Sequence, residues 1–498
     1  LYFCTDFLYQ MPVSRSGCGR QNKLKTKLIM KKFFLAVAAV ACSLSAAAEG
    51  YQVNNLSSRH NGMGHVGTAM KLDSESVWFN PAAAAFQQSK FDFSFGVTGI
   101  AAKATYTSLP DYRGGELSRA VSDNKISTPL YFYANYKPTE WMSVGLAFNT
   151  PFGSSMNWGN DWQGAHLIQQ IDLASYNFQP TVSFRIGKHL SVGAGLMVTW
   201  GSFDLSKSLL PVGASTNATL NALAGRLNPA LAGTTLFDAA GNRAIASVDL
   251  EGKAKAGVGV NVGIMWDINE QWSLGFTYRS RIDMKVDDGS IGLRLIDNPQ
   301  IAAVVSQALP MVMDGLTPEV VAASKIKTEL PLPGSLTWGV SFRPVQKWEF
   351  AVDLQYVLWS AYDRLDVDLI LPTGVTVPLQ QSEKNYSNTL AFRFGGQYHA
   401  LPWLTARMGM YVDESPVSSD YLNPETPSMT KLAYTAGLTF RPAKFCSLDV
   451  AYGFVKSADP ERTGSTPATN IITGDISAFS GNYTARAHTF SIGARFSF

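Results

Sequence analysis

Cysteine is scarce in this chain, which has four cysteines among 498 residues. Cys4 and Cys18 lie near the N-terminus, and Cys42 lies in a segment with the pattern of a signal peptide. A mature protein without these segments keeps only Cys446, and one cysteine cannot form a disulfide within a chain. The sequence therefore excludes a fold held together by disulfides.

Charge and long apolar runs are also limited. Charged residues make up 16% of the chain and the formal net charge is +3, so nucleic acid is not an expected partner. Beyond residue 48 no run of 18 apolar residues occurs. This absence excludes a transmembrane helix from the mature chain.

The first 48 residues divide into two parts. Residues 1–29 begin with Leu, share no pattern with the rest, and are expected to be translated upstream sequence. Residues 30–48 carry two lysines, a short apolar core and three alanines in the order of a signal peptide. A lipoprotein signal with Cys42 as the lipidated residue is the alternative, although Ala39 stands where such signals usually have Leu. Export without disulfides leads either to the periplasm or, as a β-barrel, into the outer membrane.

Most of the mature chain alternates between apolar and small or polar residues with a period of two. In residues 190–200, for example, Val192, Leu196 and Trp200 alternate with serine, glycine and threonine. This period predicts β-strands with one apolar face. The 12% aromatic content and the 42 glycines are typical of a large β structure.

The connections separate a membrane barrel from a soluble sandwich, because very short and long ones alternate without exception. The six short ones combine polar turn residues with a following aromatic or leucine, as expected of hairpins at a membrane interface. We therefore predict an all-β fold, a transmembrane antiparallel barrel of fourteen strands within residues 89–498. The expected strands are 91–100, 126–137, 141–150, 172–187, 190–205, 248–267, 271–285, 327–343, 348–359, 386–399, 403–412, 432–441, 446–455 and 485–498.

Residues 49–88 do not alternate and are expected to fill the lumen as a plug. Three glycines permit tight turns or close packing, and an Asn-Pro-Ala sequence forces an extended or turn dipeptide. An ordered N-terminal arm is the alternative. The plug residues singled out are Gly62, Gly64, Gly67, Asn80, Pro81 and Ala82.

Two of the long loops carry helical signals. Residues 298–325 combine helix-start signals with apolar residues at helical spacing, and residues 209–240 add several leucines and a phenylalanine. Apolar helices at the outer end of a barrel either cover a binding site or pack on each other as a lid.

An ordered set of short motifs resembles the FadL family of outer-membrane transporters for long-chain fatty acids and other hydrophobic compounds. The resemblance extends over most of the mature chain. The motifs that carry it are residues 50–53, residues 62–68, Asn80-Pro81-Ala82, residues 149–153 with Trp158, Pro180 with residues 190–196, Leu330-Pro331, Trp359-Ser360 with Tyr362, and residues 404–409 with Tyr411, Asp413 and Pro416.

The resemblance implies a hatch in the lumen, a hydrophobic groove among the outer loops, and a lateral opening at the third strand. That opening would lie at Pro151, Phe152 and Gly153, where proline cannot donate a ladder hydrogen bond and glycine supplies no side chain. The alternative is that the strand simply ends there. Fatty-acid binders of the family hold the carboxylate with basic residues near the outer end of the fifth strand. Here Lys207 is the nearest cation, so an uncharged ligand is also possible.

Two inward-facing arginines are further candidates for an anion contact. Strand parity places Arg393 and Arg407 in the lumen, roughly diagonal to each other across a hairpin. The alternative is a purely structural network, since Asp353, Asp449 and Arg495 are available as partners.

No catalytic or metal-ligand motif accompanies the six histidines, so neither an enzyme nor a cofactor is expected. The sequence thus predicts passive transport of hydrophobic small molecules across the outer membrane of a Gram-negative bacterium. A ligand-binding or adhesion barrel, such as a haem receptor using His60 and His65, and a general porin are the alternatives. The expected partners are the lipid bilayer, a hydrophobic ligand and the assembly machinery that recognises the terminal Phe498, and a monomer is expected.

Overall fold

A computed structural model describes residues 50–109, 117–312, 317–469 and 476–498. The expected upstream segment at residues 1–29 and the signal peptide at residues 30–48 lie outside the described residues. Every structural statement below refers to the described part of the chain.

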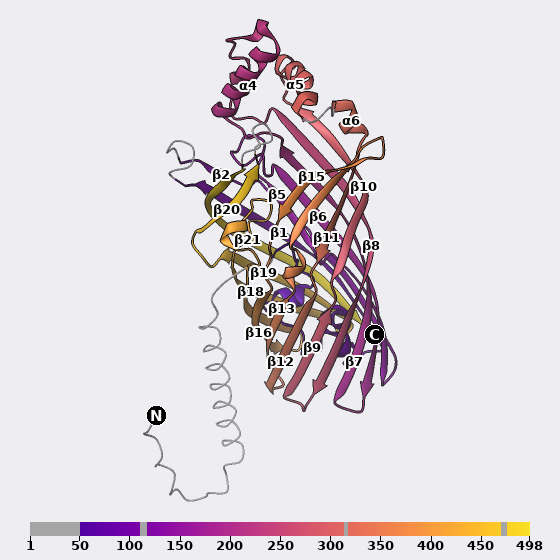
Figure 1. Cartoon of the computed structure of the whole chain (residues 1–498). Coiled ribbons are helices and arrows are strands. Elements are labelled where there is room, and N and C mark those ends of the chain that lie inside the picture. Colours follow the sequence, from indigo (N-terminus) through magenta and orange to yellow (C-terminus); the bar gives the residue numbers. More distant parts are fainter. Residues whose placement is uncertain (1–49, 110–116, 313–316, 470–475) are drawn as a thin grey trace, which may run out of the picture. The chain divides into compact units, whose positions relative to one another are not determined.

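Fourteen antiparallel strands form a closed barrel wall, which confirms the predicted fold (Figure 1). The wall closes because β1 pairs with β21 on one side and with β3 on the other. Three wall strands are interrupted and carry two labels each. The wall consists of β1 (Phe91–Ser108), β3 (Leu130–Thr139), β4 with β5 (Met142–Asn149, Gly153–Asn157), β6 (Gln170–Ile186), β7 (Leu190–Ser208), β8 (Ala246–Asp267), β9 with β10 (Trp272–Arg279, Ile282–Leu295), β11 with β12 (Lys325–Leu332, Ser335–Val345), β13 (Trp348–Val357), β16 (Thr389–Leu401), β17 (Leu404–Asp413), β18 (Lys431–Ala443), β19 (Cys446–Ser457) and β21 (Ile476–Ser497).

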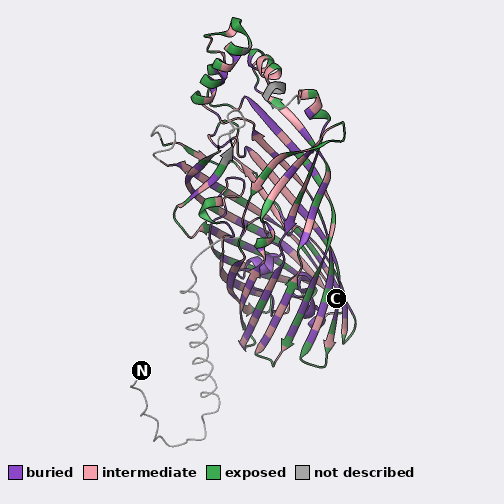
Figure 2. Cartoon of the chain, in the orientation of Figure 1, coloured by how far each residue is buried: buried purple, intermediate pink, exposed green. Residues whose placement is uncertain are grey.

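The two faces of the wall differ as the alternation predicts, and buried and exposed positions follow each other along the strands (Figure 2). On β8, Val258 is 63% exposed and faces outward, whereas Asn261, three residues further along, is fully buried and faces the lumen. An apolar outer face is what a strand in lipid requires. Large aromatic residues lie exposed beside the short turns, among them Trp141, Trp266, Trp348, Trp403 and Phe445.

Several segments expected to be loops extend the sheet beyond the wall. β2 (Arg119–Val121) pairs with β1, β14 (Arg364–Ile370) pairs with β11 and β15 (Thr376–Glu383), and β20 (Arg462–Thr469) pairs with β21. β14 with β15 and β20 with β21 join consecutive strands, whereas β11 with β14 joins strands separated by two other strands of the sequence.

The predicted loop helices are present at the end of the strands opposite the short turns (Figure 1). They are α4 (Ala214–Leu227), η3 (Pro229–Leu231), η4 (Leu236–Ala240), α5 (Pro299–Val312) and α6 (Pro318–Ala323), and η5 (Trp359–Ala361) and η6 (Ser419–Tyr421) lie in other loops. Leu220, Phe237 and Ile301 form a small apolar cluster of their own, so α4, η4 and α5 pack on each other. None of the helices described is long and apolar enough to cross a membrane.

Residues 51–87 contain four short helices and are almost entirely buried. The helices are α2 (Ser58–Asn61), η1 (Asp73–Glu75), α3 (Ser76–Phe79) and η2 (Pro81–Phe86). Their neighbours are inward-facing side chains of the wall, such as Thr98 and Ser491 around Asn61. The chain thus forms a compact segment that contacts the inner face of the wall, and we keep the name plug for it.

Candidate functional site

The wall is interrupted between residues 125–130 and residues 150–156, and we call this interruption the window. Below it, Tyr131 pairs with Asn149 as the last residues of the β3–β4 ladder. Above it, the Asp123 amide donates to the Asn157 carbonyl over 2.8 Å. Between these points no strand pairing joins the two described edges. Pro151, Phe152 and Gly153, at which the sequence predicted a lateral opening, lie on one edge of this interruption.

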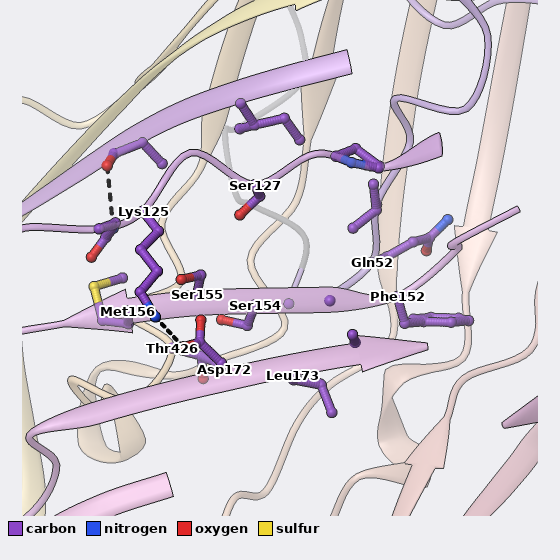
Figure 3. A pocket seen from close by; sticks show the side chains of 18 of the residues that line it. Gln52, Lys125, Ser127, Phe152, Ser154, Ser155, Met156, Asp172, Leu173 and Thr426 are labelled. Carbon is purple, nitrogen blue, oxygen red and sulfur yellow. Dashed lines mark hydrogen bonds and ion pairs between the residues drawn. The ribbon is translucent and has the colours of Figure 1, made fainter. Parts of the chain in front are cut away.

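Figure 3 shows the side chains around the window. Ser154, Ser155 and Met156 belong to β5 and form one edge of the window. Lys125 extends from the opposite edge toward Asp172 on β6, and its Nζ lies 3.9 Å from Asp172 Oδ2. Both charged side chains are substantially exposed, so this ion pair contributes little to stability. A weak exposed pair does not close the window permanently.

The N-terminal end of the plug pairs with the interrupted strand from the lumen side. The Val53 amide donates to the Pro151 carbonyl over 2.8 Å, and the Gly153 amide donates to the Tyr51 carbonyl over 2.9 Å. On its other edge, Phe152 exchanges hydrogen bonds with Ser175 of β6. Residues 51–53 therefore supply the backbone hydrogen-bond partners that β3 does not supply to residues 151–153.

An aromatic cluster holds this N-terminal segment. The Tyr51 ring meets Trp359 edge-on at a centroid distance of 4.9 Å and Tyr362 at 5.5 Å, and Phe152 lies 6.2 Å away. The Tyr51 hydroxyl donates to the Pro331 carbonyl. Each aromatic pair adds about 0.5–1.5 kcal/mol beyond area burial. The segment beside the window is thus anchored by side chains, not by a continuous sheet.

A cavity of about 1250 Å³ connects the lumen with the outer face of the wall. The residues that line this cavity come from both faces of the wall. Ala104, Leu173 and Val455 face the lumen, whereas Tyr176 faces outward. The cavity therefore passes through the wall beside the window. Its floor includes Gln52, Val53 and Asn55 of the plug.

The inner face of the wall changes character along the barrel axis. On the outer side of the plug it is apolar, with buried Tyr106, Leu205, Val248, Leu250, Ile291, Ile326, Phe479 and Tyr483. At the level of the plug it is polar, with buried Asp92, Ser94, Asn135, Ser183, Ser191, Asn261, Ser341, Asp353 and Ser491. The apolar zone is unlike the polar lumen of a porin.

Hydrogen bonds from the wall hold the plug backbone. One carboxylate oxygen of Asp353 accepts from the Gly67 amide, the Thr68 amide and the Thr68 hydroxyl at 2.8–2.9 Å. The Gly64 amide donates to the Thr435 hydroxyl over 2.8 Å. Because these groups are buried, each bond lost would leave an unsatisfied polar group.

The Asn80 side chain stabilises the predicted turn by several hydrogen bonds. Its side-chain oxygen accepts from the Ala82 amide over 3.1 Å and caps η2, which begins at Pro81. Its side-chain nitrogen donates to the Thr68 carbonyl over 2.7 Å. Asn80 thereby joins the two halves of the plug.

Ionic contacts lie near the short-turn end of the plug. Arg59 approaches Asp73 and Glu75 at 3.5 and 4.0 Å, Arg495 pairs with Asp73, and Lys71 lies 2.6 Å from Asp267. Burial outweighs the attraction of Arg59 and raises the pKa of Glu75 to about 7.

The two arginines proposed as anion contacts have protein partners. Arg393 donates to Gln355 over 2.6 Å and lies 3.8 Å from Asp413, and Arg407 lies 3.4 Å from Asp449. The expected diagonal placement is wrong, because the hairpin register places Arg407 opposite Gln397, four positions from Arg393. Each guanidinium therefore meets its own carboxylate.

Lys207, the third candidate, lies at the outer end of β7 and donates to the Gln380 side chain over 2.5 Å. A buried ion pair that the sequence reasoning did not single out lies in the same loop region, where Lys384 meets Glu425 at 2.5 Å. Within the described part of the chain, Lys207 is thus the one of the three candidates without a carboxylate partner within 4 Å.

His60 and His65 are buried within the plug. Their rings are stacked at 5.4 Å, and His60 also stacks on Phe79 at 3.9 Å. Burial lowers the pKa of both well below the usual value, so both are neutral at pH 7. The cavity beside them measures about 50 Å³, which is far too small for haem. Among the described residues, no group of three or more His, Cys, Asp or Glu could hold a metal ion.

Sequence reasoning named Tyr51 and Trp359 only within motifs of the family resemblance, named Asp353 only as a possible partner of an arginine, and did not name Lys384. The contacts of these residues have no local signal, because most of the partners are distant in sequence.

Known proteins share this fold over most of its length. The family model described as "Outer membrane protein transport protein (OMPP1/FadL/TodX)" matches residues 38–498. Outer membrane protein P1 of Haemophilus influenzae is 22% identical over 92% of this chain and 97% of its own length. The long-chain fatty acid transport protein of Salmonella typhi is 24% identical over 87% of this chain and 93% of its own.

Solved structures agree in fold. A FadL homologue from Pseudomonas aeruginosa gives a TM-score of 0.70 at 18% identity and covers 90% of this chain and 100% of its own. The toluene transporter TodX of P. putida gives 0.61 at 16% identity, with 91% and 99% covered. The chain therefore belongs to the OMPP1/FadL/TodX family of outer-membrane transport proteins, and it is a transporter of the Gram-negative outer membrane, not an enzyme.

Proposed function

We propose that this protein lets hydrophobic small molecules, long-chain fatty acids or similar lipophilic compounds, cross the outer membrane passively. The solute enters the apolar outer lumen, reaches the plug, and leaves sideways through the window. The observation that carries this proposal is that a largely apolar cavity lies above a polar plug and that the wall is interrupted beside this cavity.

The contacts of the plug argue against an axial exit. Asp353 and Thr435 hold its middle, and Asn261 and Arg279 both donate to the Trp78 carbonyl, at 2.9 and 2.7 Å. An apolar solute following the axis would have to break these buried bonds without replacing them, at about 1–3 kcal/mol each.

The free energy of the solute favours lateral exit. Each methylene transferred from an apolar site to water costs about 0.8 kcal/mol, so a twelve-carbon chain would lose on the order of 9 kcal/mol in the periplasm. Exit into the bilayer avoids most of that cost. A window facing the membrane is therefore more useful to such a solute than an aqueous pore.

The relatives support the class of solute. Among them are long-chain fatty acid transport proteins and toluene transporters. We propose that Lys207 contacts the carboxylate when the solute is a fatty acid, because Arg393 and Arg407 already meet Asp413 and Asp449.

Uptake into liposomes tests the transport proposal. Purified protein in lipid vesicles should speed entry of a long-chain fatty acid or of toluene, while sugars should not pass. Sugar flux in the wild-type protein would point to a general porin. Tight binding without delivery of either solute would favour the binding or adhesion alternative.

The window is tested by replacing Gly153 with tryptophan. Gly153 lines the cavity beside the window, and a β-carbon there would lie 3.0 Å from the Leu173 carbonyl oxygen and 3.8 Å from Val53, so we expect a tryptophan side chain to fill part of the opening. We expect Gly153→Trp to keep solute bound but to stop its delivery. Gly292→Trp is the matched control, since Gly292 lies on β10 with its nearest neighbours 3.9 Å from a β-carbon. Delivery at the wild-type rate by inserted Gly153→Trp would refute the lateral route.

We also propose that the chain inserts as a monomer and that outer-membrane assembly machinery recognises its last strand. Support comes from the pairing of the first and last wall strands, which closes the sheet on itself, and from the exposed aromatic Phe498 directly after β21.

A further inference from the structure

We infer that pairs of glycines in the wall set the position of the plug and thereby keep the barrel sealed. Four such pairs lie directly opposite each other on neighbouring strands, and we call them the glycine slots. They are Gly193 with Gly263, Gly275 with Gly339, Gly395 with Gly409, and Gly96 with Gly493.

The slot on β16 and β17 receives plug backbone. A β-carbon at Gly395 would lie 1.9 Å from the Met63 carbonyl oxygen, and one at Gly409 would lie 2.2 Å from the Met63 carbonyl carbon. Both distances are far below van der Waals contact, which is about 3.5 Å or more between carbon atoms. Backbone atoms cannot rotate away as a side chain can, so the plug fits here only because the wall has no side chains.

Two other slots also receive the plug, and the fourth receives Tyr131 and the plug residue Ser58. Most of the atoms that would clash with an added β-carbon are backbone atoms or atoms of buried polar side chains. The nearest atoms to an added β-carbon are the Thr68 carbonyl oxygen at 2.1 Å for Gly275, Asp353 Oδ1 and the Thr68 β-carbon, both at 2.7 Å, for Gly339, the Pro81 carbonyl carbon at 2.5 Å for Gly193, the Asn80 side-chain oxygen at 2.1 Å for Gly263, the Ile492 carbonyl oxygen at 2.4 Å for Gly96, and the Tyr131 hydroxyl at 2.1 Å for Gly493.

The slots are accompanied by hydrogen bonds that fix the inserted backbone. Beside Gly193, Ser191 donates to the Ala82 carbonyl over 2.8 Å and Ser183 donates to the Pro81 carbonyl over 2.6 Å. Beside Gly395 and Gly409, Thr435 accepts from the Gly64 amide. Close approach and hydrogen bonding therefore act at the same points around the wall.

Crowding in the lumen does not explain the slots by itself. Glycine inside a strand costs about 0.5–1 kcal/mol relative to alanine, and two facing glycines double that cost. Some strand glycines have room, since a β-carbon would find its nearest neighbour at 3.6 Å for Gly99 and at 3.9 Å for Gly292. Others are close to atoms of the wall itself, as Gly201 is, where a β-carbon would lie 2.3 Å from the Ala174 carbonyl oxygen. Three of the four slots differ from these because the added β-carbons would meet the plug.

The experiment compares alanine at slot and non-slot glycines. Gly395→Ala and Gly409→Ala are the test variants, and Gly99→Ala and Gly292→Ala are matched controls on other wall strands. Two readouts report the seal: sugar-driven swelling of liposomes, and tryptic cleavage after the plug residues Arg59 and Lys71, followed by mass spectrometry. Neither readout depends on which hydrophobic solute is carried, so the seal and the proposed transport can fail separately.

We expect both slot variants to insert, because the ladder uses backbone groups, and to show roughly tenfold or greater increases in plug cleavage together with sugar leakage. The controls should behave as the wild type. Cleavage and leakage in both slot variants at control levels would overturn the inference.

A milder variant covers the case in which Gly395→Ala does not insert. A β-carbon at Gly437 would lie 3.0 Å from the Gly62 α-carbon, so Gly437→Ala requires a smaller shift. Cleavage above the controls in this variant supports the inference, and cleavage equal to the controls refutes it.

Discussion

At the scale of single residues, Asp353 joins the wall to the plug. It receives three hydrogen bonds from Gly67 and Thr68 on one oxygen, and it is 2% exposed. We expect Asp353→Ala to loosen the plug by about 3 kcal/mol, because buried donors lose their acceptor. Tryptic cleavage after Lys71 measures this, and Asp353→Asn, which retains one oxygen acceptor, should show a smaller increase. Equal cleavage in the wild type and Asp353→Ala would contradict the assigned role.

Glu75 gives a pH dependence whose sign follows from its raised pKa. The carboxyl has a pKa near 4.5 when exposed and about 7 in the plug, so between these values the folded protein retains a proton that the unfolded chain loses. Stability from this group is greatest below pH 4.5, falls as the pH rises to about 7, and is constant above, with a total loss of up to about 3 kcal/mol.

Glu75→Gln should remove that fall while preserving an acceptor for the Ser57 hydroxyl, which lies 2.8 Å from the carboxylate. Thermal unfolding at about pH 5 and pH 8 checks this. Wild type and variant should differ in their pH dependence, and parallel curves would show that Glu75 does not titrate there.

Lys207 tests the charge of the solute. If it contacts a carboxylate, Lys207→Met should slow fatty-acid uptake roughly tenfold and leave toluene uptake unchanged, because a charge-assisted hydrogen bond contributes about 1.5–3 kcal/mol. The same loss for both solutes would indicate a structural role for the Lys207–Gln380 contact.

At the scale of elements, the plug depends on the turn before η2. Replacing Asn80 and Pro81 with alanine removes the cap, worth about 1 kcal/mol, and the bond to the Thr68 carbonyl. We expect the double variant to insert normally, since the strands pair elsewhere, but to transport hydrophobic solutes at an altered rate. Wild-type uptake by the correctly inserted variant would show that this turn does not set the working shape of the plug.

Three wall strands are interrupted, and the sequence reasoning predicted one of these three breaks. The break between β4 and β5 was predicted because proline and glycine mark it. The breaks between β9 and β10 and between β11 and β12 were not, since residues 271–285 and 327–343 were expected to be continuous. The break between β11 and β12 has a local signal that the sequence reasoning did not use, since Pro333 and Gly334 separate the two segments, whereas only Ser280 and Arg281 separate β9 from β10.

At the scale of the whole molecule, the barrel closes where its first and last strands meet. Phe91 and Phe498 exchange two backbone hydrogen bonds at 2.8 and 3.0 Å, and the Phe498 ring stacks on Phe445 at 6.0 Å. We expect Phe498→Ala to lower the amount of protein that reaches the outer membrane, while the inserted fraction transports normally. Phe490→Ala is the control, because that residue is equally exposed on the same strand. Equal insertion of the two variants would exclude a special role for the terminal aromatic residue.

The sequence by itself determined the class of fold, the fourteen strands, the face that each strand turns to lipid, and the position of the weak point in the third strand. These are local properties: a period of two, the lengths of turns, and the missing donor of Pro151. Sequence also identified glycines 62, 64 and 67 as places of close packing, without their partners.

Only the tertiary structure decided what the candidate residues touch. Arg393 and Arg407 meet separate carboxylates because the hairpin register differs from the expected one by two positions. Asp353, Tyr51 and the glycine slots have no local signature, since a buried group gains its role from atoms hundreds of positions away, brought together when the wall closes around the plug.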